Sequence, residues 1–199
     1  MKKFYITIGR QHGCGGRIIG KELAKRLNIN YYDKEIIIDM IAKETGFARE
    51  TVSGLMEHRT SSLLYEMATL AHTNPLEEQV FIAKTTIVNR LADQGPFVIV
   101  GSCADYILRD RENLLRIFLY GDPEKRIERI VNVYKDCSYM NEQQLKAFDR
   151  NRADYYRFFT SYKWGVRSNY DMLLNTDLGL ESITDMLELI ARKSFLGSD

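Results

Sequence analysis

The residues with the clearest potential for chemistry are the glycines of IGRQHGCGGRIIGKELAKRL, residues 8–27. Gly13, Gly15 and Gly16 fall between a strand-like run and a helix-like run. A strand, a glycine loop and a helix N-terminus aim several backbone N–H groups at one point, and the helix dipole adds positive potential there. We therefore predict a phosphate site at this loop. The alternative is a tight strand-to-helix turn with no ligand.

The loop departs from the phosphate-loop pattern GxxxxGK followed by Ser or Thr in either register. With Gly15 as the second motif glycine, the first glycine falls on Arg10 and the lysine on Gly16. With Gly16 as the second, Arg17 takes the lysine position and Ile18 the position of the hydroxyl that would bind Mg²⁺. Arg17 is then the basic side chain left near the donor phosphates, which an arginine can bind with two hydrogen bonds.

A second group of polar residues lies in KAFDRNRADYY, residues 146–156. On a helix, Asp149 and Arg152 are one turn apart, whereas Arg150 falls on another face. Arginines in this position suit closure over transferring phosphates, because phosphoryl transfer needs charge stabilisation more than covalent chemistry. The alternative for any single arginine here is a solvated, salt-bridged helix.

Asp33 and Cys14 each have two interpretations. Asp33 precedes KEII, so it is either a helix N-cap or a carboxylate linked to catalysis or Mg²⁺, and one carboxylate can do both. Cys14 is either a small residue tolerated in a tight loop or a thiol whose pKa is lowered by the helix N-terminus, which would favour oxidation. We expect the Trp164 ring to pack in the core rather than against a ligand.

Short apolar runs predict the strands that position these residues. The runs span residues 4–9, 29–33, 96–101, 114–121 and 170–177. Helical patterns span residues 17–27, 34–46, about 48–72, 76–94, 123–135, 142–162 and 180–193. Strands that alternate with helices predict a three-layer α/β fold with a parallel sheet of about five strands, in which ligands lie beyond the carboxyl ends of the strands.

The composition excludes several classes of protein. A chain of 199 residues that is 45% hydrophobic and 28% charged fits one globular domain. The net charge of +1 gives no reason to expect binding to nucleic acid or to acidic membranes. Cys14, Cys103 and Cys137 are too widely spaced for a disulfide framework or a zinc site. No signal peptide is visible and the apolar runs are too short to span a bilayer, so we expect a cytoplasmic protein.

The chain resembles the cytidylate kinase-like family of P-loop proteins, relatives of bacterial cytidylate kinase among the nucleoside monophosphate kinases. The matching pieces cover the whole chain: ITIGRQHGCGGR, YYDKEII, VIVGSCADYIL, DRNRA, and YDMLLNT with the final helix. The resemblance implies one P-loop NTPase domain over residues 1–199. Residues 48–95 would be a helical insertion that binds the monophosphate, and residues about 136–150 a mobile lid.

The resemblance also implies site residues. Asp33 would face the reaction centre, Asp149 would bind the nucleoside, and Arg152, with Arg150, would bind phosphates. The phosphate loop would consist of Gly13, Cys14, Gly15, Gly16 and Arg17.

Two departures from the family pattern bear on activity. Cytidylate kinase has GRD where this chain has GSC, so its arginine and aspartate fall on Ser102 and Cys103. This loss bears on specificity for cytidine, and Asp105 is a candidate replacement for the carboxylate. The phosphate-loop lysine of cytidylate kinase falls on Gly16, and this loss bears on catalytic power.

We therefore expect a phosphotransferase that moves the γ-phosphate of ATP to a nucleoside monophosphate such as CMP or dCMP, with Mg²⁺ bridging the donor phosphates. Arg17, Asp33 and Arg152 are the expected catalytic residues, and Asp33 is the candidate metal-linked carboxylate. The expected partners are small nucleotides, without nucleic acid or membrane, and the oligomeric state is open. Two alternatives stand beside this function: a regulatory protein that binds nucleotide without transfer, and a partner-binding α/β protein that uses the helices of residues 48–95.

Overall fold

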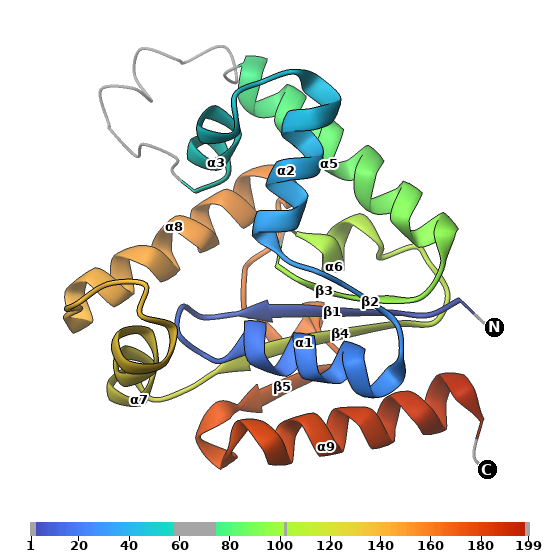
Figure 1. Cartoon of the computed structure of the whole chain (residues 1–199), viewed down its shortest axis with the longest axis vertical. Helices are drawn as coiled ribbons and strands as arrows, with labels where there is room; N and C mark the ends of the chain where they lie inside the picture. The colour runs from blue at the N-terminus through green and yellow to red at the C-terminus, as the bar shows by residue number, and fades with distance from the viewer. Residues whose placement is uncertain (1–2, 58–74, 102, 198–199) are drawn as a thin grey trace.

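The computed structural model describes residues 3–57, 75–101 and 103–197 of the chain. Its centre is a sheet of five parallel strands with helices against both faces (Figure 1). The strands lie in the order β2-β3-β1-β4-β5. They are β1 Tyr5–Arg10, β2 Asn30–Tyr32, β3 Phe97–Val100, β4 Leu114–Tyr120 and β5 Met172–Asn175. The predicted three-layer α/β fold is confirmed.

Helices connect the strands and cover the sheet. The longer ones are α1 Gly16–Leu27, α2 Lys34–Thr45, α3 Arg49–Glu57, α5 Pro75–Gln94, α8 Glu142–Thr160 and α9 Leu180–Ala191. Two short helices, α6 Ala104–Ile107 and α7 Pro123–Glu128, follow β3 and β4. In the described ranges, none of the helices combines the length and the apolar character that crossing a bilayer requires.

Two helical segments differ from the sequence expectation, and a third is tested only in part. The predicted helix of residues 123–135 is divided into α7 and a π-helical segment, Arg129–Tyr134. Helix α6 was not expected, because it is too short to show a helical period. The predicted helix of residues 48–72 begins as α3, but its remainder from residue 58 lies outside the described residues.

The two faces of β1 contribute to two separate cores. Ile6 and Ile8 belong to a buried cluster with Leu23 of α1 and Leu187 of α9. Tyr5 points the other way, into a cluster built with α2 and α5. Successive side chains of a strand alternate between faces, so a continuous apolar run such as FYITIG is what a strand covered on both sides needs.

The loop after β1 depends on glycine at two positions. Gly13 and Gly15 both have φ near +80°, which L side chains rarely adopt. A Cβ atom on Gly13 would lie 2.6 Å from the carbonyl oxygen of Arg126, and one on Gly15 would lie 2.6 Å from the side chain of Leu180. The glycines therefore allow the loop to turn tightly between α7 and α9 before α1 begins.

The carboxyl ends of β1, β2 and β3 meet at one edge of the sheet, beside α8 (Figure 1). β1 leads into the glycine loop, β2 leads to Asp33, and β3 leads to Gly101. The predicted lid of residues 136–150 consists of a loop and the first half of α8. This edge is where the sequence predicts a ligand site.

Candidate active site

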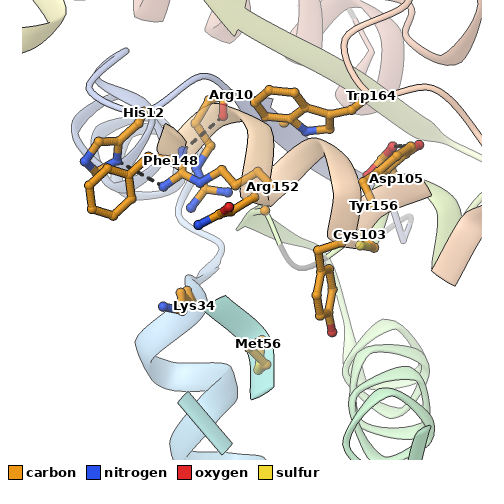
Figure 2. Close-up of a pocket in the computed structure, with 14 residues that line it drawn as sticks. Arg10, His12, Lys34, Met56, Cys103, Asp105, Phe148, Arg152, Tyr156 and Trp164 are labelled. Atoms are coloured by element: carbon orange, nitrogen blue, oxygen red, sulfur yellow. Dashed lines mark hydrogen bonds between the residues drawn. The ribbon is translucent and has the colours of Figure 1, made fainter. Parts of the chain in front are cut away.

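Two adjoining cavities open at this edge. The first, which we call the loop cavity, is lined by residues 10–17 of the glycine loop together with Asp33, Glu35 and Asp136. The second, the aromatic cavity, is lined by Phe148, Tyr155, Tyr156 and Trp164, with Asp105 among them (Figure 2). Four basic residues line both cavities and mark their junction: Arg10, His12, Lys34 and Arg152.

Arg152 is held at the junction by two contacts with the glycine loop. Its Nη1 donates to the carbonyl oxygen of Arg10 at 3.2 Å, and its Nη2 lies 3.2 Å from Nδ1 of His12 (Figure 2). A guanidinium has no acceptor, so Nδ1 must accept and His12 is neutral. Burial, and then the charge of Arg152, lower the pKa of His12 to about 3.

The other basic groups of the junction are desolvated cations. Burial, and then the nearby charge of Arg10, lower the pKa of Arg152 to about 9. Burial is also the main reason why the pKa of Lys34 is lowered, to about 8. The pKa of Arg10 is lowered mainly by burial as well. Arginine stays protonated in proteins, and a lysine with a pKa of about 8 is mostly protonated at pH 7. The junction is therefore suited to bind an anion with several negative charges.

Asp149 lies behind the loop and lines neither cavity. Its Oδ1 accepts from the backbone N–H of His12 at 2.7 Å, and its Oδ2 pairs with Nη2 of Arg126 at 2.5 Å. Arg126 also donates from Nε to the carbonyl oxygen of His12 at 2.7 Å. Asp149 therefore orders the glycine loop in this structure, and its predicted contact with a nucleoside stays a prediction.

Loss of the Asp149 charge should destabilise the protein more than loss of an exposed charge. We expect Asp149→Asn to lower the free energy of unfolding by roughly 2 kcal/mol, because Arg126 would be left buried without its anion. Asp136→Asn is the matched control, since the Arg17–Asp136 pair is about 40% exposed and should contribute below about 1 kcal/mol. Urea unfolding measures both, and equal losses would contradict the assignment.

Arg17 and Arg150 have different surroundings. Nη2 of Arg17 pairs with Asp136 at 2.6 Å, and its guanidinium lies 4.2 Å from the centre of the Tyr134 ring. Arg17 lines the loop cavity, with its side chain about 40% exposed. Arg150 is exposed on α8 and lines neither cavity.

Asp33 is the N-cap of α2, as one of its two interpretations predicted. Its Oδ1 accepts from the backbone N–H groups of Glu35 and Ile36, and its Oδ2 accepts from the Tyr31 hydroxyl at 3.0 Å. Asp33 also lines the loop cavity, so the cap does not remove it from the site. Both functions of this carboxylate are compatible with its position.

Asp105 and Trp164 line the aromatic cavity. Asp105 is buried, its Oδ2 accepts from the Tyr156 hydroxyl at 2.6 Å, and burial raises its pKa. Trp164 packs edge to face on Phe118, with ring centres 5.0 Å apart. The expectation of a core tryptophan is thus only half correct, because the ring also faces the cavity.

The interpretation of Cys14 as a thiol with a lowered pKa is wrong. The side chain is 1% exposed and belongs to the core beneath α1 and α9. Burial raises the pKa of the thiol to about 11, which outweighs the helix N-terminus and the nearby arginines. Cys14 is a small core residue in the loop.

Sequence reasoning missed most of the basic groups of the site. Arg10 ends β1 and Lys34 begins α2 directly after β2, so their positions at strand ends were an available signal. Arg126 and Arg129 had no such signal, because both reach the loop from α7 and its π-helical continuation. Arg129 donates from Nη1 to the carbonyl oxygen of Gly13 at 2.5 Å.

The residues present fit a magnesium–nucleotide complex rather than a bare metal. The part of the chain that the structure describes contains no group of three or more His, Cys, Asp or Glu side chains that could hold a metal ion. Mg²⁺ commonly binds proteins through one or two carboxylates plus substrate phosphates. Asp33, in the wall of the loop cavity, fits this limited contribution.

Solved structures with the same fold include kinases. An uncharacterized protein from Eubacterium ventriosum ATCC 27560 is 25% identical, with a TM-score of 0.69 over 96% of this chain and 99% of that chain. A gluconokinase from Sinorhizobium meliloti 1021 is 14% identical, with a TM-score of 0.56 over 96% of this chain and 93% of that chain. A shikimate kinase from Acinetobacter baumannii in complex with shikimate is 16% identical, with a TM-score of 0.52 over 98% of this chain and 96% of that chain.

No curated protein sequence matches the chain. The kinase neighbours share the P-loop kinase fold, and the family match agrees with a phosphotransferase. The model of the cytidylate kinase-like family matches residues 5–178, so the chain belongs to that family.

Proposed function

We propose that this protein transfers the γ-phosphate of ATP to a nucleoside monophosphate, with CMP and dCMP as the first acceptors to test. One observation supports this function above the others: the loop cavity and the aromatic cavity meet at Arg10, His12, Lys34 and Arg152. A triphosphate in the loop cavity and a monophosphate whose base lies in the aromatic cavity would bring their phosphates together at this junction.

The proposed reaction needs positioning and positive charge. An oxygen of the acceptor phosphate forms a bond to the γ-phosphorus while the bond to the β,γ-bridging oxygen breaks, and that electron pair leaves with ADP. A monophosphate at neutral pH is already deprotonated, so no general base is required. Arg152 and Lys34 would stabilise the charge of the transferred group. Mg²⁺, when bound with the nucleotide, would neutralise charge on the donor phosphates.

The loop and lid residues have complementary proposed roles. The backbone amides of residues 13–17 would bind the donor phosphates, and Arg17 would add a contact from the rim of the loop cavity. Asp33, in the wall of the loop cavity, would contribute a carboxylate oxygen to the metal. Arg150 would reach the donor only if the lid segment moved.

The aromatic cavity suits a planar acceptor group. Trp164 and Tyr156 contribute rings to its wall, and Asp105 adds a carboxylate within hydrogen-bond reach of the Tyr156 hydroxyl. Away from the basic junction, the wall consists mainly of aromatic rings, with Asp105 and Asn151 as polar groups. Such a wall matches a nucleobase, which can stack on the rings, better than it matches a small polyol, which has no ring face. The base preference would depend on whether Asp105 accepts a hydrogen bond from the base or donates one to it.

The test is ADP release from Mg·ATP with CMP, dCMP, UMP, AMP and GMP as acceptors, and with shikimate and gluconate as acceptors of the non-nucleotide kind. We expect turnover with at least one pyrimidine monophosphate and none with shikimate or gluconate. Turnover with shikimate or gluconate alone would contradict a nucleotide acceptor. Absence of turnover with every acceptor would contradict the kinase function.

A second function, nucleotide binding without transfer, is favoured by one observation. Glycine occupies the lysine position at residue 16, and the nearby Arg17 is paired with Asp136. Under this alternative, Mg·ATP raises the melting temperature but no acceptor releases ADP. The same samples therefore separate the two functions.

A further inference from the structure

The side chain of Arg10 lies against Gly16, which occupies the lysine position of the phosphate-loop pattern. In the GxxxxGK pattern, Arg10 stands at the first glycine and Gly16 at the lysine. A Cβ atom on Gly16 would lie 3.2 Å from Cγ of Arg10 and 3.6 Å from its Cβ. A lysine at residue 16 and an arginine at residue 10 would therefore compete for the same space.

The far end of Arg10 lies against a second glycine. Gly101, directly after β3, has φ of +83°, and a Cβ atom there would lie 1.9 Å from Nη1 of Arg10. The guanidinium thus occupies the volume that any other residue at position 101 would fill. Figure 2 shows it beside Arg152, and it lines both the loop cavity and the aromatic cavity.

Asp33 favours the charged form of Arg10, but Arg10 has no direct ion-pair partner in the described part of the chain. No described carboxylate forms an ion pair with it, whereas Arg17 is paired with Asp136 at 2.6 Å. A desolvated guanidinium has only donors and is unfavourable until an anion reaches it. The geometry and the charge therefore both select Arg10, ahead of Arg17, as the inner cation of the loop.

We propose that Arg10 replaces the missing phosphate-loop lysine: its guanidinium binds the transferring phosphoryl group, and Gly16 and Gly101 provide the space for it. The identification of that group as a γ-phosphate rests on the proposed function. The binding of a polyphosphate by Arg10 does not rest on the proposed function, so it can be measured without an acceptor.

The first experiment measures the binding of inorganic tripolyphosphate and of Mg·ATP by calorimetry. We expect Arg10→Met to weaken tripolyphosphate binding about ten- to a hundredfold, the usual effect of one lost charge-assisted contact. Arg17→Met should weaken it less than Arg10→Met does. The reverse order would overturn the proposal and assign the lysine role to Arg17.

The second experiment displaces Arg10 without changing any charge. In Gly101→Ala, the new methyl group would overlap the position of the Arg10 guanidinium. The flexible arginine can move away, so the protein should still fold, but tripolyphosphate binding should weaken. Gly46→Ala is the matched control, because Gly46 has φ of +76° but nothing within 4 Å of its Cβ position. It carries the same backbone strain and should bind tripolyphosphate as the wild type does. Equal binding by the two variants would show that Gly101 does not serve Arg10.

The third experiment exchanges the two positions. Arg10→Gly alone should weaken tripolyphosphate binding as Arg10→Met does. Arg10→Gly combined with Gly16→Lys, which restores GxxxxGK, should bind tripolyphosphate at least tenfold more tightly than Arg10→Gly. A double variant that binds no better than Arg10→Gly would contradict the exchange. If binding depends on Arg10 in this way but no acceptor is turned over, the proposed function fails and the assignment of Arg10 stands.

Discussion

Arg152→Ala is expected to lower kcat for acceptor-dependent ADP release by about a thousandfold, the lower end of what an arginine contributes to phosphoryl transfer in other systems. The guanidinium lies where the two cavities meet and is fixed by the carbonyl oxygen of Arg10 and by Nδ1 of His12. Because the side chain is held before substrate arrives, little ordering is required when the charge of the transferred group develops. Steady-state kinetics with the best acceptor measures the effect.

Two further variants show whether the arginine acts through charge or through geometry. Arg152→Lys keeps the charge but cannot make both fixed contacts, so we expect it to recover only a small part of kcat. Arg157→Ala removes an exposed arginine from the same helix and should leave kcat within about twofold, as surface changes usually do. If Arg152→Ala lost less than tenfold in kcat, Arg152 would be a support for the loop rather than a catalytic residue.

The strands and the loop could be predicted because their signals are local. The run FYITIG, the glycines after it and the helical period of residues 17–27 lie next to one another in the sequence, and each has a direct structural meaning. The N-cap at Asp33 was readable for the same reason, since a cap depends on the two or three residues that follow it. The order of the strands was not predicted, because it depends on which strands pair across the chain.

The partners of the site could not be predicted, because they come from distant elements. Asp149 meets Arg126 and the backbone of His12 only after α7 and α8 have packed beside the loop. A search for a lysine at the motif position led to Arg17, the neighbour of Gly16 in sequence. The structure instead brings Arg10 over Gly16, and only three-dimensional contacts reveal that relation.

Burial sets the pKa of the residues for which nearby charges alone would predict the wrong direction of shift. One of the two interpretations of Cys14 had its pKa lowered by a helix N-terminus, but desolvation in the core raises that pKa to about 11. A sequence shows which residues are ionisable, but it does not show how much water each one keeps. Lys84 is the extreme case, because nothing in its sequence context distinguishes it from an exposed lysine.

Lys84 should make the protein more stable as pH rises from 7 to 10. The side chain is fully buried in α5, its Nζ donates to the Tyr155 hydroxyl at 2.7 Å, and burial lowers its pKa to about 8. In the unfolded chain the same lysine titrates near 10.4, so between these pH values the unfolded state binds more protons and stability increases with pH. The shift corresponds to roughly 3 kcal/mol, at about 1.4 kcal/mol for each pH unit.

Other groups near Lys84 do not produce the same pH dependence. Cys103 and Asp105 both favour its charged form, and burial raises the pKa of each, that of Cys103 to about 11. Both residues are present in the wild type and in a Lys84 variant, so their own titration in the folded and unfolded chains cancels when the two proteins are compared. The pKa of Tyr155 is raised well above 10 by burial. Lys34 does titrate near pH 8, but it is present in every variant and cancels when two variants are compared.

Lys84→Met tests this contribution, because methionine keeps the length of the chain and removes the charge. Urea unfolding at pH 7 and at pH 10 should show that the wild type gains about 2 to 3 kcal/mol more than the variant. Lys146→Met is the matched control, since Lys146 is 67% exposed in a surface pair and should not alter the pH dependence. Parallel pH profiles for wild type and Lys84→Met would mean that Lys84 is not desolvated. A pH profile that is steeper for the wild type than for Lys84→Met would show that Lys84 is desolvated. The buried Lys84 ammonium then links α5, in the predicted monophosphate-binding insertion, to Tyr155 of α8, three residues from Arg152.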